Sequence, residues 1–178
     1  MDTTLKSIQR AYINMKLDEA KKMPGNYVSI DVLNFKVPKF AIPKSGKILS
    51  RDKRHITLIY SENTDVPKSV IEKALESFPE KIIVAADKFA VFDNPDDEKT
   101  VTLVLKVKSK NLDDMSKKLI DIGCKHSYDS INHHISIAYG VDKDEATIIV
   151  DEQPQYDDDI IVGGLTIEPI VDDWSETL

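Results

Sequence analysis

Apolar residues recur at every second position over residues 54–60, 100–107 and 132–139. Side chains with this period lie on opposite faces of a β-strand, so each stretch predicts a strand with one apolar and one polar face. Other extended patterns bounded by turn-forming residues add further expected strands, which span 27–32, 81–92, 147–150 and 160–170. The chain is therefore expected to be rich in β-sheet.

Three stretches have the period of an α-helix instead. Residues 5–22 carry an apolar stripe that includes Tyr12, and periodicity alone predicts that Tyr12 belongs to the core. A second helix is expected over 67–78, where the proline at its start suits the first helical position. A third is expected between Asn111, which can cap it, and Gly123, which can end it.

Length and composition are those of one globular domain. The chain has 178 residues, of which 41% are hydrophobic and 31% charged, so we expect a single domain over 1–178 with a core of its own. No run is long and apolar enough to span a bilayer, and the first residues lack a signal pattern. The lone cysteine, Cys124, follows a predicted helix end and is expected to be a packing residue. A reducing, cytoplasmic location is the expectation, that of a host cell if the protein is viral.

Charge is unevenly distributed along the chain. The net charge is −7, which argues against a surface that tracks long nucleic acids. A proline-interrupted connection over 33–53, however, leads into the first histidine strand with a single acidic residue, Asp52. The basic residues from this connection to the strand start are Lys36, Lys39, Lys44, Lys47, Arg51, Lys53 and Arg54. Long loops in compact domains are often binding loops or lids, so this one predicts a local site for a small phosphate ligand.

A short motif occurs twice, as His55-Ile-Thr57-Leu and as His134-Ile-Ser136-Ile. Because side chains alternate along a strand, His55 shares a face with Thr57, and His134 shares a face with Ser136. If the two strands meet, two imidazoles and two hydroxyls line one site. His133 faces away from His134, and His126 lies outside both motifs, so both are expected to be dispensable for catalysis.

These residue types suit the cleavage of a phosphodiester next to a ribose 2′-hydroxyl. One imidazole removes the proton of the attacking hydroxyl, and the other, protonated, supplies a proton to the leaving oxygen. Thr57 and Ser136 would donate hydrogen bonds to the non-bridging oxygens as negative charge develops. No glycine-rich phosphate loop, CxxC pair or His-Glu metal pattern is found, so neither a cofactor nor a metal is expected. The residues alone leave open which histidine is the base.

The paired motifs, on strands about half a domain apart, resemble those of the 2H phosphoesterase superfamily over about residues 27–170. The resemblance implies an α+β fold with two pseudo-symmetric lobes, antiparallel sheets around a central cleft, and outer helices. It also implies metal-independent phosphodiester cleavage, with His55, Thr57, His134 and Ser136 as the catalytic residues. Members include tRNA-splicing cyclic phosphodiesterases, 2′-5′ oligoadenylate phosphodiesterases and phage anti-CBASS nucleases, which destroy cyclic oligonucleotide alarm signals.

The acidic tail, 171–178, and the residues before it are similar to the anti-CBASS branch. Glu168 and Trp174 resemble an acidic-then-tryptophan element that grips the cyclic dinucleotide in that branch. Tyr12 and either Lys36 or Lys39 match its other base- and phosphate-contacting positions.

The expected function is therefore cleavage of 3′-5′ bonds in cyclic di- or oligonucleotides, which evades anti-phage immunity. The expected partner is this small cyclic nucleotide, with no long nucleic acid and no membrane; the oligomeric state is left open. Two alternatives remain at this point. One is a 2′-5′ oligoadenylate or 2′,3′-cyclic phosphodiesterase that acts on RNA ends. The other is a non-catalytic nucleotide-binding sponge, although a sponge would not need both imidazoles.

Overall fold

A single antiparallel sheet organises the computed structural model, which describes residues 25–62, 66–154 and 156–170. Its seven strands lie in the order β2-β6-β5-β4-β7-β1-β3. The strands are β1 (Gly25–Val32), β2 (Lys47–Ile48), β3 (His55–Ser61), β4 (Lys81–Asp93), β5 (Thr100–Lys108), β6 (His134–Asp142) and β7 (Asp159–Ile170). The helices are α2 (Lys68–Leu75), α3 (Lys110–Asp121) and α4 (Lys143–Asp151), with short 3-10 turns η1 (Lys39–Ala41) and η2 (Arg51–Lys53).

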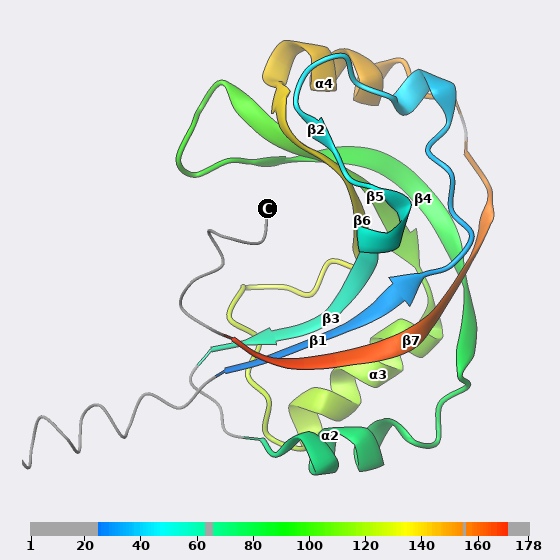
Figure 1. The fold of residues 1–178 in the computed structure, drawn as a ribbon, viewed down its shortest axis with the longest axis vertical. Coiled ribbons are helices and arrows are strands. Elements are labelled where there is room, and N and C mark those ends of the chain that lie inside the picture. Colours follow the sequence, from blue (N-terminus) through cyan, green and yellow to red (C-terminus); the bar gives the residue numbers. More distant parts are fainter. Residues whose placement is uncertain (1–24, 63–65, 155, 171–178) are drawn as a thin grey trace, which may run out of the picture.

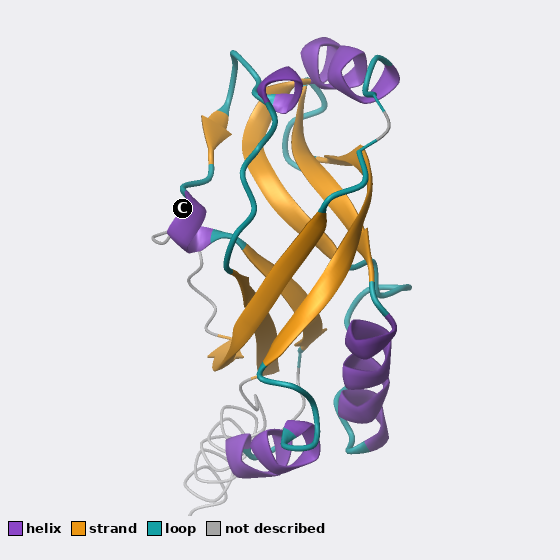
Figure 2. Cartoon of the chain, turned by 90° about the vertical axis from the view of Figure 1, so that its right-hand side faces the viewer, coloured by secondary structure: helices purple, strands orange, loops and turns teal. Residues whose placement is uncertain are grey.

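The sheet bends into two lobes. In Figure 1 the lobe of β1, β3 and β7 lies below, with α2 and α3, and the lobe of β2, β5 and β6 lies above, with α4. The long strands β4 and β7 pair with each other and connect the lobes. The helices lie on the outside of the strands (Figure 2). The bend brings β3 and β6 into contact although they lie at different ends of the strand order.

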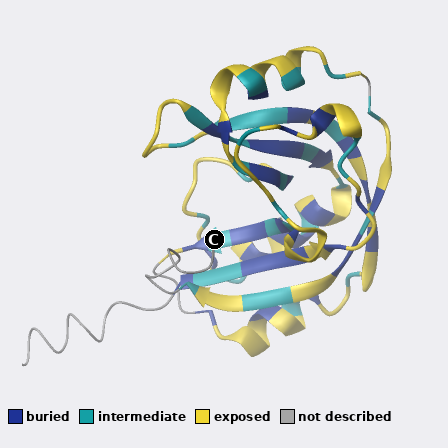
Figure 3. Cartoon of the chain, turned by 45° about the horizontal axis from the view of Figure 1, so that its top comes forward, coloured by how far each residue is buried: buried dark blue, intermediate teal, exposed yellow. Residues whose placement is uncertain are grey.

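The core follows from the alternation in the sequence. The apolar residues of the motif strands, such as Ile56, Leu58, Ile135 and Ile137, are fully buried. Figure 3 shows this burial along the strands and the exposed outer surfaces of the helices. Cys124 is buried too, as expected of a packing residue. The histidines and hydroxyl residues of the motifs are half-buried on the opposite strand faces.

Two local predictions are wrong. Residues 147–150, expected as a strand, belong to α4, because the side chain of Asp142 caps this helix by accepting from the backbone of Asp144 and Glu145. The short apolar run there suits a helix as well as a strand. The cap of α3 is Ser109 rather than Asn111, which lies inside the helix. The expected helix over 5–22 and the tail 171–178 lie outside the described residues.

The connection over residues 33–53, called the basic connection below, is packed against the rest of the structure. Aromatic rings hold η1 to the body: the Phe40 ring lies 5.5 Å from that of Phe89 and 6.4 Å from that of Tyr156. Since Phe89 is a buried residue of β4, η1 lies on the core side of that strand. None of the helices that the structure describes is long and apolar enough to cross a membrane.

Candidate active site

The two motif strands share more than the motif itself. In each strand the pairing register shifts just after the hydroxyl residue, so Leu58 has no partner in β1 and Ile137 has none in β5. Such a bulge changes which face the following residues occupy. As a result Tyr60 and Tyr139 return to the faces of His55 and His134, respectively. The repeat therefore extends to six residues, His-Ile-Thr-Leu-Ile-Tyr and His-Ile-Ser-Ile-Ala-Tyr.

Both imidazoles are held in the same way. The Nδ1 atom of His55 lies 3.0 Å from the carbonyl oxygen of Lys53, and that of His134 lies 2.6 Å from the carbonyl oxygen of Asn132. A carbonyl only accepts, so in both rings Nδ1 carries the hydrogen. Within the described ranges no hydrogen bond occupies either Nε2 atom. Each histidine therefore presents Nε2 for proton transfer.

The two imidazoles lie close enough to influence each other. Burial is the main cause that lowers the pKa of His134, and the positive charges of His55 and Lys106 lower it further, against a hydrogen bond to Asn132 that raises it. The structure thus brings together the two histidines that the motifs predicted. Burial and the nearby positive charges hold the ring of His134 toward its neutral form.

A tyrosine that the sequence did not single out joins the site. Cross-strand pairing places Tyr27, Ser29 and Asp31 of β1 beside Tyr60, Thr57 and His55 of β3, on the same face. The hydroxyl of Tyr27 lies 3.3 Å from Oγ1 of Thr57, and its ring makes an edge contact with His55 at 5.9 Å. Burial raises the pKa of Tyr27, so its phenol remains a hydrogen-bond donor at neutral pH.

Tyr27 also connects the site to one predicted ligand contact and to the other lobe. Glu168 of β7 is its cross-strand partner on the other side, and the carboxylate of Glu168 contributes to the raised pKa of Tyr27. Tyr139 of the second lobe contributes to the raised pKa of Tyr27 as well. Glu168 therefore lies on the strand face that bears Tyr27 and His55, and its role as a ligand contact stays a prediction.

Lys106 is a second residue that sequence reasoning missed. It is the cross-strand partner of His134, so both side chains project from the same face. The ring of Phe92 completes this side, with its centroid 4.7 Å from that of His134. The alternation over residues 100–107 is the signal that could have found it, since it puts Lys106 on the polar face of the strand.

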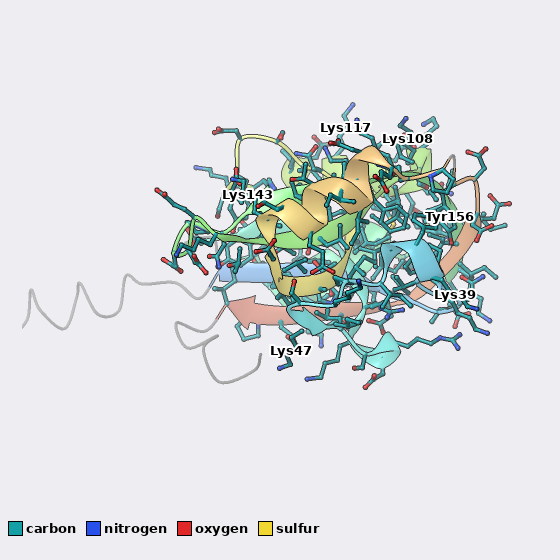
Figure 4. The ribbon with its side chains drawn as sticks, turned by 90° about the horizontal axis from the view of Figure 1, so that it is seen from above. Lys39, Lys47, Lys108, Lys117, Lys143 and Tyr156 are labelled. Carbon is teal, nitrogen blue, oxygen red and sulfur yellow. The ribbon has the colours of Figure 1, made fainter. Side chains whose placement is uncertain are left out.

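Of the two lysines predicted to contact phosphate, Lys39 begins η1 and Lys36 precedes it. Lys39 borders a groove of about 670 Å³ between η1 and α4, whose lining is Lys39, Phe40, Ile42, Lys44, Ser45, Glu145, Ile148 and Ile149. Lys36 is exposed in the segment before η1. Lys47 of β2 pairs with Tyr139; Figure 4 shows Lys39 and Lys47 projecting at separate places. Tyr12 and Trp174 lie outside the described residues.

Comparisons with known proteins agree with this geometry. Residues 25–177 match the family model described as "Anti-CBASS protein Acb1". No curated protein matches the sequence. Among solved structures, Usb1 of Kluyveromyces marxianus is similar over 85% of this chain and 95% of its own, with a TM-score of 0.55 at 13% identity. LigT of E. coli, solved with 3′-AMP, is similar over 84% of this chain and 96% of its own, with a TM-score of 0.45 at 12% identity. The match to Usb1 concerns the fold, and the predicted two-lobed 2H phosphoesterase fold is confirmed.

Proposed function

This chain belongs to the Acb1 family of anti-CBASS proteins, and from that premise we propose that it is a phosphodiesterase that cleaves 3′-5′ bonds of cyclic oligonucleotides. Cleavage would remove the alarm signal on which CBASS immunity depends. The observation that supports this proposal best is the pair of electrostatically coupled imidazoles, each tied through Nδ1 and presenting Nε2. A binding protein would need neither the pair nor the common tautomer.

We propose the two proton-transfer roles from the surroundings of His134. His134 is the general base, because burial and two nearby cations favour its neutral form. Its Nε2 takes the proton of the ribose 2′-hydroxyl while the 2′-oxygen attacks phosphorus. His55 is the general acid and gives a proton to the 5′-oxygen as the P–O5′ bond breaks. The product is a 2′,3′-cyclic phosphate, which water can open with the two roles reversed.

Hydroxyl groups stabilise the charge that develops on phosphate. Thr57 and Ser136 flank the histidines on the same strand faces and donate to the non-bridging oxygens. The phenol of Tyr27, 3.3 Å from Thr57, is a third donor within reach of the same phosphate. The ammonium group of Lys106 offsets the negative charge from the other lobe.

Groups further from the histidines would recognise the ligand as a nucleotide. Glu168, beside Tyr27, can accept a hydrogen bond from the edge of a base. Lys47, paired with Tyr139, is the member of the basic connection that we assign to a phosphate of the ligand, in place of Lys36 and Lys39. Tyr12 and Trp174 remain proposed base contacts on the strength of the family resemblance.

One assay tests the proposal against its alternatives. The purified chain is incubated in EDTA with 3′,3′-cyclic GMP-AMP, with 2′-5′ oligoadenylate and with a dinucleotide that ends in a 2′,3′-cyclic phosphate, and products are separated by chromatography. We expect linear products from the first substrate at the highest kcat/KM. Preferred turnover of either other substrate would replace the proposed one. Tight binding with ligand recovered intact would instead support the sponge.

A further inference from the structure

The outer edge of β3 is covered by the segment that leads into β6. As the last strand of the sheet, β3 has one edge without a neighbouring strand. The backbone N–H of Ser127 donates to the carbonyl of Tyr60 at 2.8 Å, and the N–H of Tyr60 lies 3.3 Å from Nδ1 of His126. One residue pair further, the N–H of Glu62 donates to Oγ of Ser127 at 2.8 Å. The segment that leads into β6 is thus held along the open edge of β3.

The connection that lies nearest to the motifs runs through Ser116 of α3. Its buried hydroxyl donates to the carbonyl of Leu58 at 2.8 Å. Leu58 is the bulge residue directly after Thr57 and has no partner in β1. The same hydroxyl oxygen lies 3.0 Å from Nε2 of His133, the residue directly before His134. Two hydrogen bonds therefore join β3 to β6, although these strands do not pair in the sheet.

Counting hydrogens fixes the direction of both bonds. The carbonyl of Leu58 can only accept, so the single hydrogen of Ser116 goes to it. The bond between Ser116 and His133 must then use a hydrogen on Nε2. The Nδ1 atom of His133 faces a carboxylate oxygen of Asp113 at 3.3 Å. The chain of bonds thus runs from His133 through Ser116 to Leu58, and Nδ1 donates to Asp113 only when the His133 ring is protonated.

We propose that Ser116 and His133 are positioning residues, which set the separation and orientation of the imidazoles of His55 and His134. This inference rests on the proposed function, since positioning matters only if both rings act on one phosphate. His133 was expected to be dispensable because it faces away from His134. That other side is where the structure shows the contact that links the two motifs. A shift of about 1 Å in a reacting group can cost about 100-fold in rate.

The test compares Ser→Ala variants of two serines that hydrogen-bond to the backbone in or just after β3. Ser116→Ala removes both bonds of the chain, and alanine suits its place inside α3. Ser127→Ala is the matched control, because it removes another side-chain bond to the same edge further from the motifs. We expect Ser116→Ala to lower kcat about 10- to 100-fold with KM within twofold, and Ser127→Ala to leave both within twofold. Equal kcat in the two variants would overturn the proposal.

The role of His133 is tested by comparing two variants, His133→Gln and His133→Ala. In His133→Gln the side-chain amide can still donate to Ser116, whereas His133→Ala removes the donor. We expect the glutamine variant to retain at least a third of the wild-type kcat and the alanine variant to fall with Ser116→Ala. If both variants lose activity equally while folded, the hydrogen bond is not what matters, and the proposal fails.

A readout without substrate separates this inference from the proposed function. The chain has four histidines, so each imidazole Hε1 resonance can be assigned by single substitution and followed by NMR across pH. We expect Ser116→Ala to move the titration of His55 and His134, and Ser127→Ala to leave both unchanged. Unchanged titration in Ser116→Ala would refute positioning. Inactivity of the wild type on every nucleotide tested would refute the proposed function alone.

Discussion

Replacement of Arg54 tests what holds the basic connection beside the site. Arg54 directly precedes His55, and its side chain is buried, with the residue 8% exposed. Its guanidinium donates to the carbonyls of Leu49 at 2.8 Å and Phe35 at 3.3 Å, and lies over the Phe35 ring at 5.8 Å. In the described part of the chain it has no carboxylate partner, and its Nε has no hydrogen-bond acceptor. Burial accordingly lowers its pKa.

The free-energy change for Arg54→Met follows from these contacts. Methionine fills part of the volume but leaves two carbonyls without a donor, at about 1–3 kcal/mol each for a buried group. The longer bond to Phe35 contributes at the low end of that range. Removing a buried cation recovers part of its desolvation cost. We therefore expect the free energy of unfolding to fall by about 1–3 kcal/mol.

Urea denaturation followed by fluorescence measures this change, and Arg51→Met is the control. Arg51 is exposed and makes one bond, to the carbonyl of Leu33 at 2.5 Å, so its loss should cost less than about 0.5 kcal/mol. Trypsin should also cleave the connection faster in Arg54→Met, since its lysines lie between the two released carbonyls. If Arg54→Met is as stable as the wild type, the desolvation cost of the buried guanidinium equals the free energy that its hydrogen bonds contribute, and the reasoning above is refuted.

Four further outcomes are expected. His55→Ala and His134→Ala should each lower kcat by about two to four orders of magnitude, and a folded variant with near-native turnover would remove that histidine from the mechanism. The kcat/KM profile should fall on the acid side below pH 6.5, because the base His134 must be neutral and its pKa is lowered from that value; an acid limb above pH 6.5 would contradict the assignment. Unfolding free energy should likewise decrease as pH falls below 6.5, since His126, His133 and His134 all have lowered pKa values and the unfolded chain binds more protons there; a flat urea midpoint from pH 7 to 5.5 would oppose this. Trp174→Ala should weaken binding of a cyclic dinucleotide about tenfold, the worth of one stacked base, and spare a short linear 2′,3′-cyclic phosphate, as calorimetry would show.

Local alternation determined where the motif side chains lie on their strands. A period of two fixes the face of each side chain without reference to the rest of the chain. His55 with Thr57 and His134 with Ser136 therefore followed from the sequence, as did the strand bounds near them. The same logic failed at 147–150, because a short apolar run has no period that distinguishes helix from strand. There the capping side chain of Asp142 decides.

Tertiary structure decided which groups meet. Strand order and register depend on contacts between residues far apart in sequence, so no local pattern places Tyr27 beside Thr57 or Lys106 beside His134. The bulges that return Tyr60 and Tyr139 to the motif faces belong to the pairing and not to either strand alone. For the same reason the lysines and arginines of the basic connection predicted a positively charged site but not where that site lies in the fold. Phe40, packed on Phe89 of β4, places the neighbouring Lys39 beside α4.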